Sequence, residues 1–231
     1  GAGDDVLDLQ LTTRKSAHID LGEGADLLSL NGVRTGRNLK IFAGGGNDTI
    51  HAGGTNVGRK LRVESGAGND EVLITGQSQV RNRTNISLGD GNDFFGVVPT
   101  GASTRSGEFR GRTKIDAGSG DDRVALDATA GLMSGTEVDG GAGTGDALQN
   151  SGGRRLNAIN FETASISGLD TVVESILQRL RDAGVDLDQD GDPELSVATS
   201  TAALVFTENG TATAADAGIV LTATGSPRVS G

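Results

Sequence analysis

The 231-residue chain has a formal net charge of −11 and contains 38 glycines but no cysteine, tryptophan or tyrosine. Its acidity and its lack of these aromatic residues argue against nucleic-acid binding, and the lack of cysteine excludes disulfide bonds and a thiol nucleophile. No run of apolar residues approaches the length needed to cross a membrane.

One short pattern recurs from the first residue onward: Gly-x-Gly-x-Asp, followed two residues later by an apolar residue. Its six aspartates are Asp5, Asp26, Asp48, Asp70, Asp93 and Asp122, spaced 21, 22, 22, 23 and 29 residues apart. Its glycine pairs are Gly1 and Gly3, Gly22 and Gly24, Gly44 and Gly46, Gly66 and Gly68, Gly89 and Gly91, and Gly118 and Gly120. A degenerate seventh copy, with one extra residue, ends at Asp146. A period of this length predicts a stack of equivalent coils.

The residues around each turn predict strands. A β-branched aliphatic residue stands three positions before the first glycine of each later copy: Ile19, Ile41, Val63, Ile86, Ile115 and Val138. Apolar residues also alternate after each aspartate, as Leu28 and Leu30 do after Asp26. Because alternation with a period of two indicates strands with one buried face, we expect two strands per coil. The predicted fold of residues 1–150 is all-β: a parallel β-solenoid, or β-roll, of about seven coils stacked about 4.8 Å apart.

The turn pattern also has a chemical interpretation. Glycine allows the positive φ angles of tight turns, and the aspartate adds a charged oxygen at the same place. Sites built from oxygen ligands of irregular geometry suit calcium better than magnesium. The pattern resembles the calcium-binding repeat of the RTX (repeats-in-toxin, hemolysin-type) family, over residues 1–146. The resemblance implies Ca²⁺ sites in which the six motif aspartates supply side-chain oxygens, the motif glycines supply carbonyl oxygens and Asp146 serves the degenerate copy.

The chain departs from the RTX pattern in one respect. The family's nine-residue unit places a calcium turn on both edges of a coil, whereas here one turn occurs per coil, so we expect calcium along one edge only. The alternative is a set of Asp-Gly and Asn-Gly turns that hold no metal. The burial of a thin, glycine-rich core offsets little of the conformational entropy that the chain loses on folding, so we predict that calcium binding drives folding. Weak calcium sites and the absence of cysteine favour a secreted, extracellular or cell-surface protein.

The edge opposite the aspartates is basic. Arginines and lysines lie between the two predicted strands of successive coils: Arg14, Lys15, Arg34, Arg37, Arg59, Lys60, Arg81, Arg83, Arg105, Arg110 and Arg112. One interpretation is a ridge that meets an anionic glycan, another cell-surface polymer or the acidic edge of a second copy. The other is a set of solvated loops whose charges prevent wrong pairing of strand edges.

Residues 151–231 predict a small α+β cap. Apolar residues at helical spacing from Leu169 to Ala183, followed by Gly184, predict an amphipathic helix that covers the end of the solenoid. Asp186, Asp188 and Asp190 resemble the first half of an EF-hand calcium loop, but Val197 takes the place of its final glutamate. Short strands are expected within 202–206 and 218–222.

The first coil begins directly at a repeat turn, with no preceding polar segment to cover it. Either the chain is a piece of a longer solenoid, or something covers this end. We expect the carboxy-terminal region of another copy to cover it, which would give a head-to-tail homo-oligomeric fibre. No metalloprotease or hydrolase motif is present, and His18 and His51 fall in predicted strands, where we expect surface residues rather than catalysts. The prediction is an extracellular calcium-binding structural protein and not an enzyme. The alternatives are an adhesin or glycan-binding module that uses the basic edge, or a polysaccharide-modifying enzyme.

Overall fold

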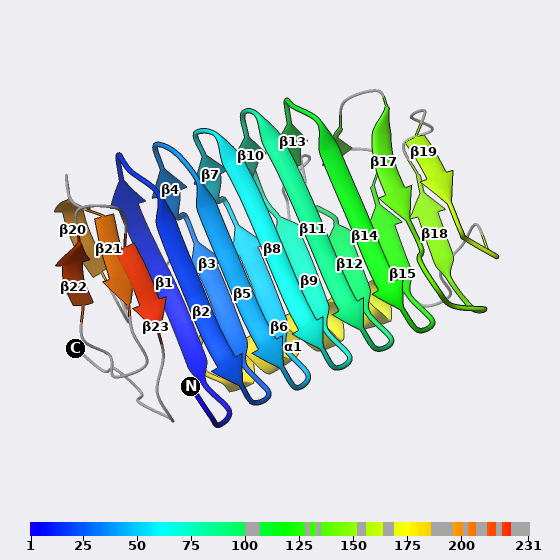
Figure 1. Ribbon diagram of the computed structural model, residues 1–231, viewed down its shortest axis with the longest axis horizontal. Helices are drawn as coiled ribbons and strands as arrows, with labels where there is room; N and C mark the ends of the chain where they lie inside the picture. The colour runs from blue at the N-terminus through cyan, green and yellow to red at the C-terminus, as the bar shows by residue number, and fades with distance from the viewer. Residues whose placement is uncertain are drawn as a thin grey trace.

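The computed structural model describes residues 1–99, 107–127, 130–132, 135–151, 156–163 and 169–185, together with the backbone of four strands between 196 and 222. Strands of successive coils pair in parallel and in register along one axis (Figure 1). The predicted parallel β-solenoid is therefore confirmed.

Two large parallel sheets form the flat sides of the solenoid. The strands that follow the motif aspartates make one sheet, which we call the covered sheet: β1 (Val6–Thr13), β3 (Leu27–Asn31), β6 (Thr49–Gly53), β9 (Glu71–Thr75), β12 (Phe94–Val97), β15 (Arg123–Leu126) and β18 (Ala147–Asn150). The strands that precede the turns make the exposed sheet: β2 (Ala17–Glu23), β5 (Leu39–Gly45), β8 (Lys60–Ala67), β11 (Arg83–Asp90), β14 (Thr113–Ser119), β17 (Thr136–Asp139) and β19 (Leu156–Ile159). Since β19 pairs with β17, the stack continues past residue 150.

A third, narrow sheet runs along the edge opposite the aspartates. The coils that contribute to it have three strands, whereas two strands per coil had been expected. It consists of β4 (Arg34–Thr35), β7 (Asn56–Val57), β10 (Gln79–Val80), β13 (Gly107–Phe109) and β16 (Ala130–Gly131). Each of these strands buries at least one residue, such as Val57 or Val80. Strands of two or three residues are too short to show an alternating pattern, so they could not be predicted from the sequence.

The core lies between the two large sheets and consists of in-register ladders. The six aliphatic residues that precede the turns stack directly on one another, from Ile19 to Val138, and each is at most 2% exposed. On the facing sheet, Leu28, Ile50, Val72 and Phe95 form the matching ladder. Because identical registers repeat, one apolar position per strand produces a continuous core.

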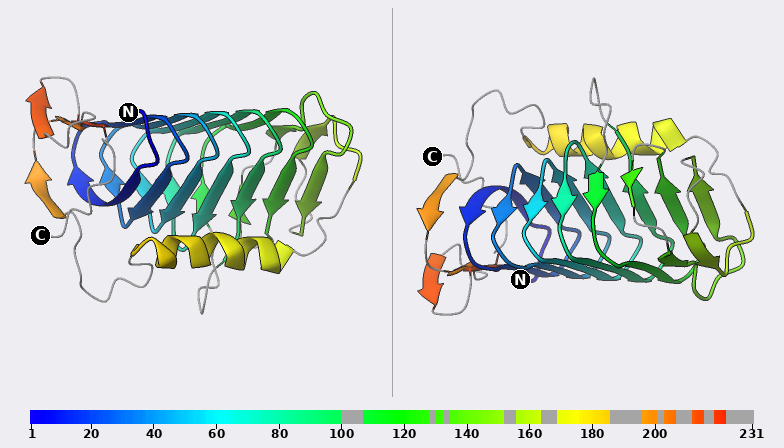
Figure 2. Two further views of the ribbon diagram at one scale, coloured as in Figure 1. Left: turned by 90° about the horizontal axis from the view of Figure 1, so that it is seen from below. Right: turned by 90° about the horizontal axis from the view of Figure 1, so that it is seen from above.

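The predicted helix forms, but not at the end of the solenoid. Helix α1 (Leu169–Asp182) lies along the outer face of the covered sheet and crosses several coils (Figure 2). Its buried residues Ile176 and Leu180 pack in one cluster with Leu73, Phe94 and Val98 of the sheet. Its Arg179 forms an ion pair with Glu71 of β9. The covered sheet carries apolar side chains on both faces, and its outer face therefore needs the helix as cover.

The chain's own carboxy-terminal strands lie against the first coil. Strand β20 (Ser196–Ser200) pairs with β1, and strands β21 (Ala203–Phe206) and β23 (Ile219–Thr222) pair with β2. Strand β22 (Ala212–Ala215) pairs antiparallel with β21. Another copy of the chain had been expected to cover the first coil. In the structure, strands β20, β21 and β23 of the same chain cover it instead. Among the residues that the structure describes, no helix is both long and apolar enough to cross a membrane.

The position of α1 gives a first testable prediction. Leu180→Ala should lower the free energy of unfolding by about 2–4 kcal/mol, because Leu180 is fully buried against the covered sheet. Gln178→Ala, on the exposed side of the same helix, should change it by less than about 0.5 kcal/mol. Urea unfolding followed by circular dichroism measures both. Equal effects of the two substitutions would contradict this packing of the helix.

Candidate functional site

The motif glycines bring successive turns into direct contact. In the first six copies every motif glycine after Gly1 has a φ between 104° and 140°, a region in which side chains are strained. Space is equally restrictive: a Cβ at Gly44 would lie 1.7 Å from the carbonyl oxygen of Gly22, and one at Gly68 would lie 2.0 Å from that of Gly46. Glycine is thus required both by conformation and by the close approach of the coils.

The motif aspartates form one buried row, which we call the aspartate column: Asp5, Asp26, Asp48, Asp70, Asp93, Asp122 and Asp146. Each is at most 2% exposed. The backbone N–H of each one, up to Asp122, donates to Oδ1 of the aspartate in the next coil, at 2.7–2.8 Å. The structure therefore brings together all seven aspartates that the repeat predicts, the degenerate copy included.

A residue that the repeat did not predict ends this column. The backbone N–H of Asp146 donates to Oε2 of Glu162 at 2.8 Å, so a glutamate takes the place that an eighth aspartate would occupy. Glu162 follows the last copy of the pattern and lies outside any repeat, so spacing could not identify it. Glu162 reaches this position because the chain, after β19, runs back beside the turn that contains Asp146.

A second, exposed ladder runs beside the column in the opposite direction. The backbone N–H of Asn69 donates to Oδ1 of Asn47, and that of Asn92 donates to Oδ1 of Asn69, each at 2.7 Å. Asp121 continues the row by donating to Asn92 at 2.8 Å. The side chains before the aspartates thus bond toward the next coil, whereas the aspartates bond toward the previous one. Together they hold each turn to both of its neighbours.

The second oxygen of each aspartate has no partner. Oδ2 is buried without a hydrogen bond in all seven residues of the column. Burial is the main cause that raises the pKa of Asp48 and Asp93 to about 7 and the pKa of Asp70 and Asp122 to about 6, and neighbouring carboxylates raise these pKa values further. Burial also raises the pKa of Asp26 and Asp146. A buried, unpaired carboxylate is costly, so each Oδ2 calls for a proton or a cation.

The oxygen atoms of the column are of the type that binds calcium, since each coil offers one anionic Oδ2 without a hydrogen-bond partner along this edge. The described residues contain no place where three His, Cys, Asp or Glu side chains come together. The carbonyl oxygens of Gly1 and Gly118 accept the backbone N–H groups of Glu23 and Ala142 at 2.7 Å. An ion here would draw its charged ligands from successive members of the column, rather than from a cluster within one coil. Asp186, Asp188 and Asp190 lie outside the described residues.

The two histidines occupy different environments. His18 lies on the outer face of the exposed sheet and stacks on Phe42, with ring centroids 5.0 Å apart. His51 was expected at the surface but is only 4% exposed, because the outer face of the covered sheet is buried. Its Nε2 lies 2.9 Å from Oγ1 of Thr75, and burial lowers its pKa to about 4. The prediction of a surface residue is therefore wrong for His51.

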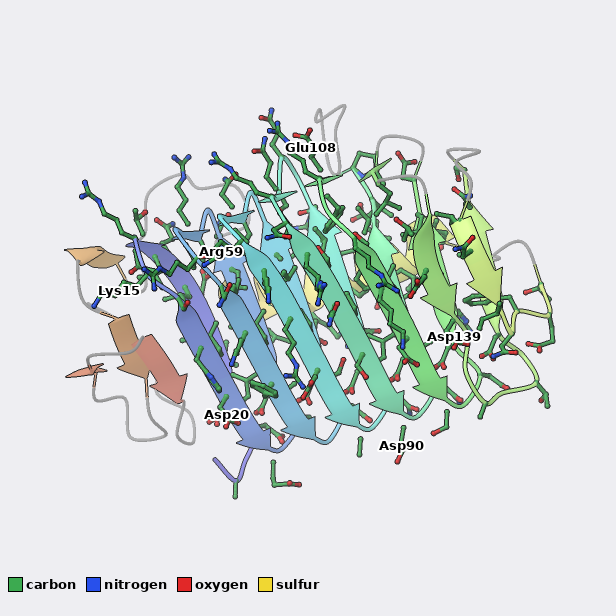
Figure 3. The ribbon with its side chains drawn as sticks, turned by 45° about the horizontal axis from the view of Figure 1, so that its top comes forward. Lys15, Asp20, Arg59, Asp90, Glu108 and Asp139 are labelled. Carbon is green, nitrogen blue, oxygen red and sulfur yellow. The ribbon has the colours of Figure 1, made fainter. Side chains whose placement is uncertain are left out.

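The predicted basic residues lie on the edge opposite the turns. Figure 3 shows Lys15 and Arg59 at one edge of the solenoid and Asp90 at the other. Arg110 and Arg112 form ion pairs with Glu108 and Glu137, and Arg105 lies outside the described residues.

Comparisons with protein-family models, with curated proteins and with solved structures find no match, so the likeness to RTX repeats rests on the motif and its spacing.

Proposed function

We propose that this chain is an extracellular calcium-binding structural protein, in which the aspartate column takes up Ca²⁺ and holds the coils of the solenoid together. The observation that carries the proposal is the row of seven buried Oδ2 atoms without hydrogen-bond partners. When bound, calcium would supply positive charge that offsets the cost of burying these carboxylates. The backbone bonds to Oδ1 meanwhile hold the carboxylates of the six aspartates after Asp5 in place.

A structural role, rather than an enzymatic one, is supported by what the aspartates already do. All seven are buried, and each one after Asp5 also accepts the backbone N–H of the preceding coil, so they are poorly placed to act on a substrate. His51 is buried beside Thr75 and is held in its neutral form near neutral pH. A stiff rod of repeated coils suits a surface layer, a matrix or a filament.

The experiment is a calcium titration with matched variants. At about pH 8, in excess chelator, the chain should lose its β-sheet circular dichroism, and calcium should restore it. The variant D48N/D70N should need about tenfold or more calcium, because two of the column's carboxylates become neutral. The control D20N/D116N removes the same charge from the outer face of the exposed sheet and should behave like the unaltered chain. A full β-sheet signal in excess chelator at about pH 8 would overturn the proposal.

For assembly we propose strand exchange between copies. Strands β20, β21 and β23 pair with the first coil through backbone hydrogen bonds, and such pairing depends little on side chains. The same strands from one copy can therefore pair with the first coil of the next and build a head-to-tail filament. Light scattering in calcium buffer should show a mass that grows with concentration, and a chain ending before residue 196 should stay monomeric. A strictly monomeric full chain at high concentration would contradict this assembly.

A further inference from the structure

Among the residues that the structure describes, eight cationic side chains on the edge opposite the aspartates form no ion pair with an acidic side chain. They are Arg14, Lys15, Arg34, Arg37, Arg59, Lys60, Arg81 and Arg83, which we call the basic edge. Within the described ranges, the ion pairs involve only other residues, such as Arg62 with Glu64 and Lys114 with Asp116. The charges of the exposed sheet are thus largely balanced locally, whereas those of the basic edge are available to a partner.

The basic edge also contains a groove. A hollow of about 720 Å³ runs across β4, β7 and β10, and the residues that line it include three arginines but no acidic and no aromatic residue. Its outward-facing row passes from Arg34 to Asn56 to Gln79, which are register partners on the three strands. These side chains offer hydrogen-bond donors on each successive coil.

Glycines explain why this groove is open. Gly36 and Gly58 continue the register of β4 and β7, between Arg14 in the first coil and Arg81 in the fourth. A Cβ at Gly36 would lie 2.3 Å from the carbonyl oxygen of Arg14, and one at Gly58 would lie 2.4 Å from that of Gly36. A side chain is therefore excluded at this one position of the two middle coils, and an arginine occupies the same position in the coil on either side.

We propose that this groove binds a linear anionic polysaccharide, lying along the stack with its carboxylate or sulfate groups against Arg14, Arg34 and Arg81. Guanidinium groups bind such oxyanions with paired, charge-assisted hydrogen bonds. A pyranose chain advances by nearly one coil height per sugar, so acidic groups three sugars apart can meet Arg14 and Arg81, which hold equivalent positions on the first and fourth coils. The open glycines admit the sugar rings, and Asn56 and Gln79 can bond their hydroxyl groups.

Nucleic acid fits the groove less well than an acidic sugar chain. Single strands bind proteins by stacking bases on aromatic side chains, and the groove contains none. Neutral sugar chains lack the charge that the three arginines would pair. The proposal depends only on the fold and on this edge, because the aspartate column lies on the opposite edge and takes no part in the groove.

The test measures binding of the full chain, in calcium buffer, to immobilised polygalacturonate, heparin and dextran. The two anionic polymers present carboxylate and sulfate groups, and preference for one of them identifies the anionic group. R14Q/R34Q/R81Q should bind the preferred polymer about tenfold or more weakly, because three charged hydrogen-bonding groups are lost. The control K40Q/R62Q/K114Q makes the same change of charge on the exposed sheet and should lose less than about threefold.

Three outcomes would overturn the proposal: no binding to either anionic polymer at low salt, equal loss in the two triple variants, or equally tight binding of dextran or single-stranded DNA. Circular dichroism of each variant shows whether it is folded, and surface arginines on this edge should be dispensable for folding. The variant D48N/D70N should bind the polysaccharide as the unaltered chain does, provided that it is folded. A failure of the calcium proposal and a failure of this one are therefore distinguishable.

Discussion

Gly68→Ala should prevent the solenoid from folding, whereas Gly3→Ala should leave it folded. Both glycines occupy the second motif position and have similar φ angles, 138° and 132°. A Cβ at Gly68 would lie 2.0 Å from the carbonyl oxygen of Gly46, but one at Gly3 would have no neighbour within 4 Å. The alanine should cost more than about 4 kcal/mol at Gly68 and about 1–3 kcal/mol, from backbone strain alone, at Gly3.

Urea unfolding or thermal melting in calcium buffer measures this pair directly. The comparison separates the cost of the close approach between coils from the cost of the φ angle, since only the former differs. Similar destabilisation by the two substitutions would show that conformation alone selects the motif glycines. It would also contradict the contact between turns that places the aspartates in a column.

Without calcium, the solenoid should be more stable at about pH 5 than at about pH 8. Burial raises the pKa of Asp48 and Asp93 to about 7 and that of Asp70 and Asp122 to about 6, so the folded chain binds protons more tightly than the unfolded chain does. The stability that these protons provide is complete below about pH 4, and it falls as the pH rises through the folded pKa values. His51 acts in the opposite direction, because burial lowers its pKa to about 4, but it is one group against four.

Calcium should remove most of this pH dependence by replacing the protons in the column. We expect the chain in excess chelator to lose more than about 3 kcal/mol of unfolding free energy between about pH 5 and pH 8. In calcium the chain should be stable at about pH 8, and D48N/D70N in chelator should show a weaker pH dependence. Unfolding curves recorded in the four combinations of pH and calcium test this. An apo chain that gains stability as the pH rises over this range would contradict the buried, unpartnered state of the column.

The repeat was sufficient to predict the solenoid and the aspartate column. A fixed period with one aspartate and two glycines per coil leaves few ways to stack the chain, and Ile19, Ile41 and Val63 fall in register as their spacing requires. The position of the carboxylates follows from that register alone. Their bonding does not, because the sequence cannot show that Oδ1 accepts a backbone N–H while Oδ2 has no partner.

What the sequence left open depends on contacts between distant segments. Leu73 of β9 and Phe94 of β12 face outward from strands whose other faces are also apolar, so alternation alone could not show that helix α1 covers them. The same burial accounts for His51. Glu162 reaches the column only after the chain has passed through the last coil, outside any repeat. The groove of the basic edge arises from strands too short to predict.

Native mass spectrometry of the folded chain tests the central claim most directly. After dialysis against calcium, the chain should carry several bound Ca²⁺ ions, and D48N/D70N should carry fewer while D20N/D116N carries the same number. A folded chain with no bound calcium, or equal numbers of ions in all three proteins, would show that the aspartate column is held by protons and backbone hydrogen bonds alone.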